Sequence, residues 1–307
     1  MDRGRAVVHF WDRGRTPVSI PGGSAWPVAS DAMAPTTETG VYLRSLAALV
    51  DNLRRTRGKT VISRIIAGHA PFEAFGRLAD RLMGGNEPTF AFQFYHPGTG
   101  WWLGNTPEVL LEHDKGSGVF RTMALAGTRL QGCPGPWDAK NLDEHRFVVD
   151  FIAETFRRHG LEVEIGRTDT VPYGRHIEHL HTPVAGIAGD HLPDFETIAA
   201  DLSPTPALCG YPRTEALEHI ARFETHDRLC YGGYITVDTP EKTVAFVNLR
   251  SMRYDERGRY NIYVGGGITA DSVPEDEYAE TAAKARSLLE PLEEIIAELT
   301  NGHSHGS

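Results

Sequence analysis

Cysteine is scarce in this 307-residue chain, which has only Cys133, Cys209 and Cys230. Three widely spaced cysteines with no C-x-x-C pair indicate neither a disulfide framework nor a zinc knuckle. We therefore expect a protein of the reducing cytoplasm.

Basic residues are also in short supply. The chain has 31 lysine and arginine residues against 41 aspartate and glutamate residues, a net charge of −10. Nucleic acids and anionic membranes are held by basic surfaces, so we expect neither as a partner. No hydrophobic run in the sequence approaches the length of a membrane span, and residues 1–26 lack the apolar core of a signal peptide.

Hydrophobic residues make up 40% of the chain, enough for a sizeable core. Apolar periodicity predicts helices over residues 41–53, 71–83, 137–158 and 274–299, and strands over residues 60–66, 90–95, 109–112, 177–187, 231–237, 243–254 and 260–264. We expect the last three strands to pair as an antiparallel meander. Runs of adjacent strands with scattered helices predict an α+β fold, with a large antiparallel β-sheet core flanked by helices.

The chain divides into three parts. We expect residues 1–45 to form a short strand and loop segment packed on the core, residues 46–300 to form the main domain, and residues 301–307 to be a disordered tail.

The last quarter of the chain combines the features of an anion site. They are an arginine on a predicted strand, a glycine run, and a helix with two carboxylates and a lysine on one face: Asn248-Leu249-Arg250-Ser251, Gly265-Gly266-Gly267, and Glu277, Glu280 and Lys284. Helix residues three apart share a face, and carboxylates suit a divalent cation. We expect a small dianionic ligand held partly through such an ion.

A set of short motifs runs in order from about Lys59 to Lys284. They are GKTVISR at 58–64, TPEVLL at 106–111, MALAGTR at 123–129, DEH at 143–145, HLHT at 179–182, SPTPALCG at 203–210 and DR at 227–228, leading to YGG at 231–233. With the C-terminal site, this ordered set resembles the chorismate-utilising enzymes, the family of isochorismate, salicylate, anthranilate and aminodeoxychorismate synthases. The resemblance implies an anthranilate synthase component I-like fold in which residues 46–300 bind chorismate. About sixty residues precede Lys59, so we expect a shortened N-terminal half.

The motifs are most similar to those of isochorismate synthase. That resemblance implies Mg²⁺-dependent isomerisation of chorismate to isochorismate, in which water is added at C2 and the C4 hydroxyl is lost. Lys59 matches the base that takes a proton from water, and Glu108 matches the acid that protonates the departing hydroxyl. Near neutral pH, a lysine base needs a lowered pKa and a carboxylic acid needs a raised one.

The resemblance also implies the ligand contacts. Glu144 and Glu280 match direct Mg²⁺ ligands, with Glu277 as a further or water-mediated one, although Glu144 could instead pair with Lys140 one turn earlier. Arg250 would bind the enolpyruvyl carboxylate through two donors, and Lys284 would neutralise the ring carboxylate. The implied substrate contacts are Gly127, Thr128, His179, Ala207, Leu208, Tyr231, Leu249, Arg250, Tyr263, Gly265, Gly267 and Lys284.

Other members of the family stay open as alternatives. Ala126 stands where similar aminodeoxychorismate synthases carry a nucleophilic lysine, so covalent amine chemistry and a glutaminase partner are not expected, although ammonia-using chemistry stays open. Tyr231 and Leu249 also occur in salicylate-forming enzymes, which leaves pyruvate elimination as an alternative. A noncatalytic chorismate-binding subunit is a third, although it would need neither Lys59 nor Glu108. We expect a monomer or homodimer serving menaquinone or siderophore biosynthesis.

Two patterns point to other classes of protein. Residues 265–270 fit the dinucleotide fingerprint G-x-G-x-x-A, but only one predicted helix follows, so no second strand completes a βαβ unit. His176, His179 and His181 are spaced to share a strand face, but no acidic or cysteine ligand lies near them at a recognisable spacing. We expect neither a dinucleotide site nor a transition-metal site.

Overall fold

The computed structural model describes residues 33–56, 58–85, 89–96, 98–173 and 177–304. Most of the predicted N-terminal strand and loop segment, residues 1–32, lies outside the described residues.

The described residues form an α+β fold, as predicted. The helices are α1 (Thr39–Thr56), α2 (Phe72–Met83), α3 (Ala139–Arg158), α4 (Phe195–Leu202), α5 (Arg213–Phe223) and α6 (Pro274–Ser304). The strands are β1 (Lys59–His69), β2 (Phe90–His96), β3 (Gly100–Thr106), β4 (Val109–Asp114), β5 (Val119–Leu130), β6 (Glu162–Ile165), β7 (Asp169–Tyr173), β8 (Ile177–Ile187), β9 (Gly210–Tyr211), β10 (Tyr234–Asp238), β11 (Lys242–Val247), β12 (Ser251–Tyr254) and β13 (Arg259–Ile268).

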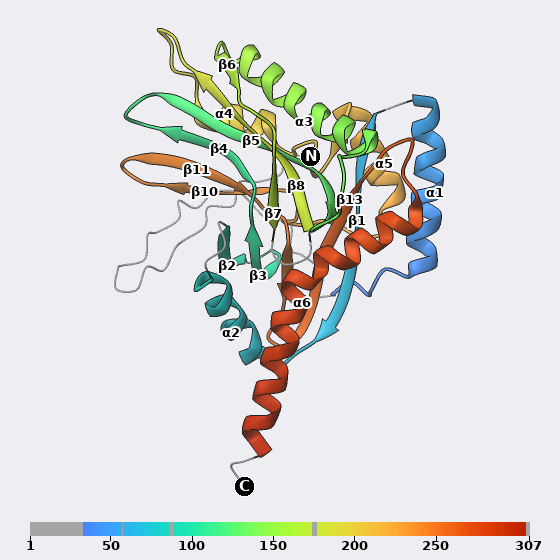
Figure 1. Cartoon of the computed structure of the whole chain (residues 1–307). Coiled ribbons are helices and arrows are strands. Elements are labelled where there is room, and N and C mark those ends of the chain that lie inside the picture. The colour runs from blue at the N-terminus through green and yellow to red at the C-terminus, as the bar shows by residue number, and fades with distance from the viewer. Residues whose placement is uncertain (1–32, 57, 86–88, 97, 174–176, 305–307) are drawn as a thin grey trace.

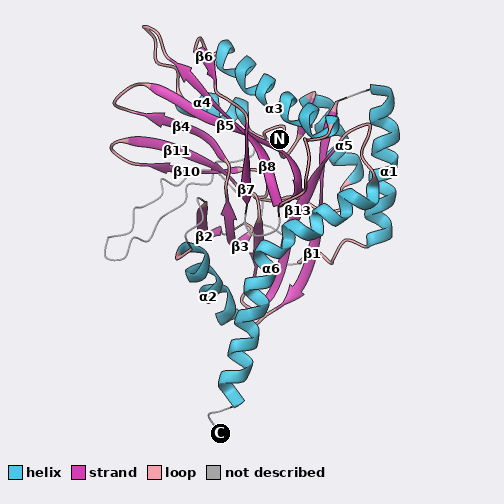
Figure 2. Cartoon of the chain, viewed as in Figure 1, coloured by secondary structure: helices cyan, strands magenta, loops and turns pink. Residues whose placement is uncertain are grey.

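The strands form two antiparallel sheets (Figure 2). One has six strands in the order β2-β3-β12-β13-β1-β9. The other has seven, in the order β10-β11-β4-β5-β8-β6, with β7 also paired to β8. Strands from both ends of the described chain therefore meet in the first sheet, where β1 pairs with β13 from Thr60 opposite Ile268 to His69 opposite Arg259.

Three apolar clusters hold the layers together. The largest contains residues of both sheets and of α3 and α4, including Ile65, Phe120, Phe156 and Tyr263. A second lies where α2 and α6 pack on the six-stranded sheet, and a third joins α1 to Ile62 and to β13. Figure 1 shows α6 running along β13 and α3 lying over the seven-stranded sheet. The two sheets thus share one core, with helices on the outer faces.

The structure differs from the predicted strand pattern at one important place. Residues 243–254, predicted as one strand of a meander, are two strands in different sheets, because β11 pairs with β4 and β12 pairs with β3 and β13. Residues 248–250 join them. Only β10 with β11, and β12 with β13, pair as the meander required. The joining residues 248–250 include no glycine or proline, so no local turn signal reveals the change of sheet.

Both predicted domain boundaries fall inside helices. The boundary between residues 45 and 46 lies within α1, and α6 continues to Ser304, so residues 301–304 of the predicted tail are helical. None of the helices in the described part of the chain is long and apolar enough to span a membrane.

Candidate active site

A cavity opens between the two sheets. Its empty space, including the solvent at its mouth, is about 610 Å³. Its wall is formed by Pro107, Glu108, Leu125, Ala126, Thr128, Glu144, His179, Ala207, Leu208, Tyr231, Leu249, Arg250, Tyr263, Val264, Gly265, Gly267 and Lys284. Every predicted substrate contact except Gly127 lines the cavity, although these residues come from segments that are far apart in the sequence.

Lys59 forms an ion pair with Glu144, which lines this cavity. Lys59, the first residue of β1, is 1% exposed, and its Nζ lies 2.8 Å from Oε1 of Glu144 on α3. Burial would raise the pKa of Glu144, but the ammonium groups of Lys59 and Lys140 outweigh it and lower that pKa to about 2. The carboxylate is therefore ionised, and the pair fastens β1 to α3.

Lys140 does not make the ion pair with Glu144 that we considered from the sequence. Its Nζ lies 2.8 Å from Oε1 of Glu277 on α6. Burial opposes the charged form of Lys140, but Glu144 and Glu277 raise its pKa above the usual value. Tertiary contact between α3 and α6 therefore replaces the pairing within one helix.

The glycine run in β13 admits carboxylates from two sides. Successive strand residues face opposite ways, and a Cβ on Gly267 would lie 2.4 Å from Oε1 of Glu144. A Cβ on Gly266 would lie 3.2 Å from Oε2 of Glu277 and 3.8 Å from Oε1 of Glu280. The absence of side chains at these positions lets α3 and α6 bring three carboxylates close to one strand.

These carboxylates suit a hard divalent cation such as Mg²⁺. Oε2 of Glu277 is buried and has no hydrogen-bond partner among the described residues. Burial and the neighbouring Glu280 carboxylate raise the pKa of Glu277, despite Lys140. Among the residues that the structure describes, however, no three His, Cys, Asp or Glu side chains are gathered as a complete metal site, and Lys284 pairs with Glu280 at 2.7 Å. A cation would therefore have to compete with ammonium groups for its ligands.

Glu108 is a buried carboxyl in the cavity wall. It lies between β3 and β4, is 3% exposed, and accepts a hydrogen bond of 3.3 Å from Oγ1 of Thr205. Burial raises the pKa of Glu108 to about 7, although the Thr205 bond and the charge of Lys59 act in the opposite direction. Glu108 can therefore hold a proton close to neutral pH, as a general acid must.

His179 and Arg250 are joined within the same cavity. The NH2 group of Arg250 donates to Nε2 of His179 at 2.8 Å, so Nε2 is unprotonated. Nδ1 therefore carries the proton and donates to the carbonyl of Gly127 at 3.2 Å. Burial, with the charge of Arg250, lowers the pKa of His179 well below its usual value. This histidine is neutral, and it orients the guanidinium.

The prediction that Arg250 lies on a strand was wrong. Arg250 lies in the segment that joins β11 to β12. Its φ is 48°, in the left-handed region that is costly for residues with a side chain. The carbonyl of Arg250 accepts from the backbone N–H of Asn105, which ties this conformation to β3. The change of sheet at residues 248–250 thus coincides with the point where the guanidinium enters the cavity.

Aromatic rings close another part of the wall. Tyr231 and Tyr263 stack with ring centroids 5.5 Å apart, and Trp102 stacks on Tyr263 from the core at 5.3 Å. Leu208 and Leu249 add apolar surface to the lining. The cavity therefore combines charged groups on one part of its wall with an apolar surface that suits a ring.

Sequence reasoning missed several supporting residues. Asn141 accepts from the backbone N–H of Thr128 at 3.0 Å, and His145 bonds the carbonyl of Ala126 at 3.1 Å. Both are on α3, close to Glu144, and they hold this helix against β5. His145 is the last residue of the DEH motif and Asn141 lies two residues before the motif, so the motif was the available signal. Four cavity residues were not predicted as contacts: Pro107, Leu125, Ala126 and Val264.

Neither competing site is supported. His179 is committed to Arg250 and Gly127, His176 lies outside the described residues, and His181 is half-buried on β8. Residues 265–267 lie inside β13, between β12 and β1, rather than in a turn that leads to a helix.

Comparison with known proteins agrees with this arrangement. The chorismate binding enzyme family matches residues 30–293, so the chain belongs to that family. It is 29% identical over 291 residues to the salicylate biosynthesis isochorismate synthase of Pseudomonas aeruginosa, covering 90% of this chain and 59% of that protein. It is 33% identical over 198 residues to isochorismate synthase DhbC of Bacillus subtilis, covering 61% of this chain and 49% of that protein.

Solved structures show the same fold. A putative 2,3-dihydroxybenzoate-specific isochorismate synthase, DhbC from Bacillus anthracis, superposes with a TM-score of 0.74 at 25% identity, covering 88% of this chain and 76% of that one. MenF, the menaquinone-specific isochorismate synthase of Escherichia coli, gives a TM-score of 0.72 at 25% identity, covering 90% and 66%. The chain spans 49% to 61% of the length of the first curated relatives that it matches.

Proposed function

We propose that this protein is a Mg²⁺-dependent isochorismate synthase that converts chorismate to isochorismate. The observation that carries the proposal is Glu108, a buried carboxyl with its pKa raised to about 7, in one cavity with an arginine and a lysine suited to two carboxylates. Family membership and the relatives named isochorismate synthase support the same reaction.

Binding would use the charged part of the wall. Arg250, oriented by His179, would hold the enolpyruvyl carboxylate, because a guanidinium offers two parallel donors. Lys284, whose Nζ also donates to the carbonyl of Gly265 at 3.0 Å, would neutralise the ring carboxylate. The apolar surface of Leu208 and Tyr231 would face the ring.

The chemical step would use Lys59 and Glu108. Lys59 takes a proton from a water molecule while the oxygen of that water bonds to C2 of the ring. The ring double bond shifts and the C4–O bond breaks. Glu108 gives its proton to the departing C4 hydroxyl, which leaves as water. Atoms and charge balance, because one proton is accepted and one is given. Only a neutral amine can accept a proton, so Lys59 has to leave its ion pair with Glu144 and lose a proton before it can act as the base.

The carboxylates of Glu144, Glu277 and Glu280 would hold the cation. When bound, Mg²⁺ would neutralise the ring carboxylate and polarise it. Glu277 offers the buried oxygen without a hydrogen-bond partner, and Glu144 offers the oxygen now paired to Lys59.

The cellular setting is also proposed from relatives and composition. The names of the relatives refer to salicylate, 2,3-dihydroxybenzoate and menaquinone, so we infer that the product enters menaquinone or siderophore biosynthesis. We further propose a cytoplasmic monomer or homodimer that acts without a glutaminase.

Product analysis tests the proposal. Purified protein is incubated with chorismate, with and without Mg²⁺ and without added amine, and the products are resolved by chromatography and NMR. Isochorismate formed only with Mg²⁺ supports the proposal. Salicylate with pyruvate would make the protein a salicylate synthase. Chorismate binding without turnover at any Mg²⁺ concentration would contradict an enzymatic role and favour a binding subunit.

A further inference from the structure

A buried ion pair outside the cavity links the strand that carries the proposed base to the turn that hydrogen-bonds the proposed acid. Glu224, which caps the C-terminus of α5, accepts from Nε of Arg228 at 2.9 Å and from its NH2 group at 2.5 Å. Both side chains are buried, at 2% and 7% exposure, and Arg228 is not part of the cavity wall. This pair has no part in the proposed proton transfers.

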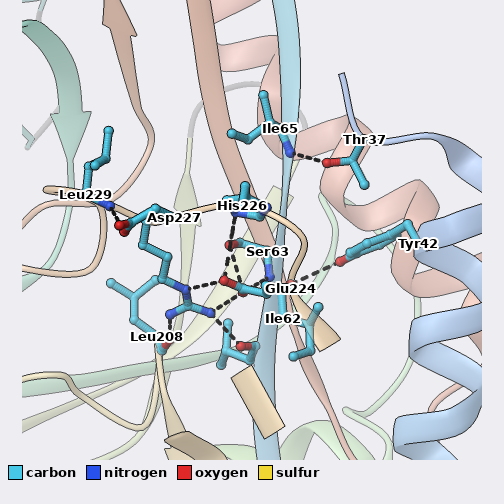
Figure 3. Close-up of polar contacts among 12 residues, drawn as sticks. Thr37, Tyr42, Ile62, Ser63, Ile65, Leu208, Glu224, His226, Asp227 and Leu229 are labelled. Carbon is cyan, nitrogen blue, oxygen red and sulfur yellow. Dashed lines mark hydrogen bonds and ion pairs between the residues drawn. The ribbon is translucent and has the colours of Figure 1, made fainter. Parts of the chain in front are cut away.

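The guanidinium of Arg228 bonds two backbone carbonyls as well. NH1 donates to the carbonyl of Leu208 at 2.6 Å, and NH2 donates to the carbonyl of Val61 at 2.8 Å. Figure 3 shows Glu224 and Leu208 within this set of polar contacts. One side chain therefore links the loop before β9 to strand β1.

Each of these carbonyls belongs to a segment that carries or hydrogen-bonds a proposed catalytic residue. Val61 is two residues beyond Lys59 on β1. Leu208 belongs to the turn in which its backbone N–H bonds the carbonyl of Thr205 at 2.9 Å, and Oγ1 of Thr205 donates to Glu108. The guanidinium thus connects the strand of the base to the hydrogen-bond partner of the acid.

The surroundings hold this guanidinium in one place. The Glu224 carboxylate also accepts from the backbone N–H of Ser63 at 2.6 Å and from its hydroxyl at 2.8 Å (Figure 3). Next to Arg228, Oδ1 of Asp227 accepts from the N–H of Leu229, whose φ is 49°. The backbone beside Arg228 is held by the Asp227 hydrogen bond, and the Glu224 carboxylate is held by the backbone and side chain of Ser63. The guanidinium of Arg228 therefore has little freedom to move.

We propose that Arg228, held by Glu224, is a positioning residue that fixes the proposed base Lys59 relative to the proposed acid Glu108 without touching the substrate. The inference rests on the proposed function. Attack at C2 and departure at C4 need base and acid at a fixed separation, and a misplacement of about 1 Å can cost on the order of 100-fold in rate. A planar group with several fixed donors can serve three acceptors at once, whereas an ammonium cannot reproduce that geometry.

The test compares Arg228→Lys and Glu224→Gln with two controls. Arg259→Lys changes another ion pair between residues four apart, the pair of Arg259 with Asp255 in the turn between β12 and β13. Ile295→Ala removes apolar contacts in the distant core around α6, so it controls for a general loss of stability. We expect the two test variants to lower kcat by roughly 10- to 100-fold with KM changed less than about threefold, and the double variant to be no worse than either single one. The controls should keep wild-type kcat.

A pH profile separates positioning from simple destabilisation. The Thr205 hydrogen bond lowers the pKa of Glu108, so a loosened turn should move the basic limb of kcat to higher pH in Arg228→Lys. Thr205→Val, which removes that bond directly and leaves the ion pair intact, should move it in the same way. An unshifted limb in both variants, a rise in KM with unchanged kcat, or losses equal to those of Ile295→Ala would overturn the proposal.

Hydrogen exchange gives a readout that does not need turnover. The N–H of Val61 bonds the carbonyl of Cys209, and the N–H groups of Leu208 and Cys209 bond Thr205. These amides should exchange faster in Arg228→Lys than in Ile295→Ala. If wild-type protein makes no isochorismate, the proposed function fails, and unchanged exchange at these amides would independently overturn the role of Arg228.

Discussion

Lys59 and Glu144 lie 2.8 Å apart between Nζ and Oε1, with side-chain exposures of 0% and 10%. The first residue of β1 is thereby joined to the N-terminal third of α3, which packs on the other sheet. Removing one member of a buried pair leaves the other charge without compensation, at a cost of about 3–5 kcal/mol. This contact therefore affects both stability and the proposed chemistry.

Replacing Lys59 with glutamine should abolish most turnover while leaving binding. General base catalysis contributes roughly 10²- to 10⁴-fold, so kcat should fall by that order. Because Lys59 is not part of the cavity lining, the dissociation constant of chorismate, measured by calorimetry, should change by only a few fold. Lys115→Gln, at an exposed pair with Asp238, is the control. Unchanged turnover in Lys59→Gln would remove the proposed base.

Glu108 should give the reaction a basic limb near pH 7. The acid is protonated below its pKa of about 7, so kcat should fall as the pH rises through that value. Glu108→Gln should lower kcat and abolish the limb. A limb that persists in this variant would assign the acid to another group.

The same residue should leave a signature in stability. Its folded-state pKa of about 7 lies above the ordinary value of 4.5, so the folded protein binds the extra proton between these values. The contribution to stability is complete below about 4.5 and is lost as the pH rises through 7. The Tm of Glu108→Gln relative to wild type should therefore increase from pH 5 to pH 8. A constant difference would contradict the raised pKa.

Gly267→Ala should disable the site without unfolding the protein. Its Cβ would lie 2.4 Å from Oε1 of Glu144 and 2.6 Å from Cε of Lys59, so the ion pair would have to move. We expect kcat to fall by on the order of 100-fold, measured by chorismate turnover, with far-UV circular dichroism unchanged. Gly76→Ala in α2 is the matched control, because its Cβ meets no atom within 4 Å, and it should stabilise the helix by up to about 1 kcal/mol. Equal activity of both variants would refute the close approach at Gly267.

Glu277 and Glu280 should be needed for divalent cation binding. Electron paramagnetic resonance of Mn²⁺ measures this binding without turnover. Glu277→Gln and Glu280→Gln should each weaken it by roughly tenfold or more, whereas Glu73→Gln, at an exposed pair on α2, should not. Removing the cation with a chelator should stop isochorismate formation by wild type. Undiminished Mn²⁺ binding in both site variants would place the ion elsewhere.

Elements with strong local patterns were predicted well. β8 has the predicted bounds, and α6 begins at Pro274 with Glu277, Glu280 and Lys284 facing the site. Segments with weak periodicity were not predicted as elements. In β5 the consecutive residues 124–127 are all buried, which hides the alternation of a strand, and the short helices α4 and α5 give few turns of periodicity.

The sequence alone determined which residue types are available and in what order. It places an arginine, a glycine run and a helix with carboxylates in one C-terminal stretch, and its ordered motifs identify the chorismate-binding family, because short-range spacing is a property of the chain itself. Only the tertiary structure decided the partners. Lys140 pairs with Glu277 rather than Glu144, residues 243–254 divide between two sheets, and Arg228 joins Val61 to Leu208. These pairings depend on which elements pack against each other across the core. A buried charge is costly unless it pairs with an opposite charge or a carbonyl, so each one pairs with a group that the fold brings close to it. No local sequence pattern specifies which elements come into contact.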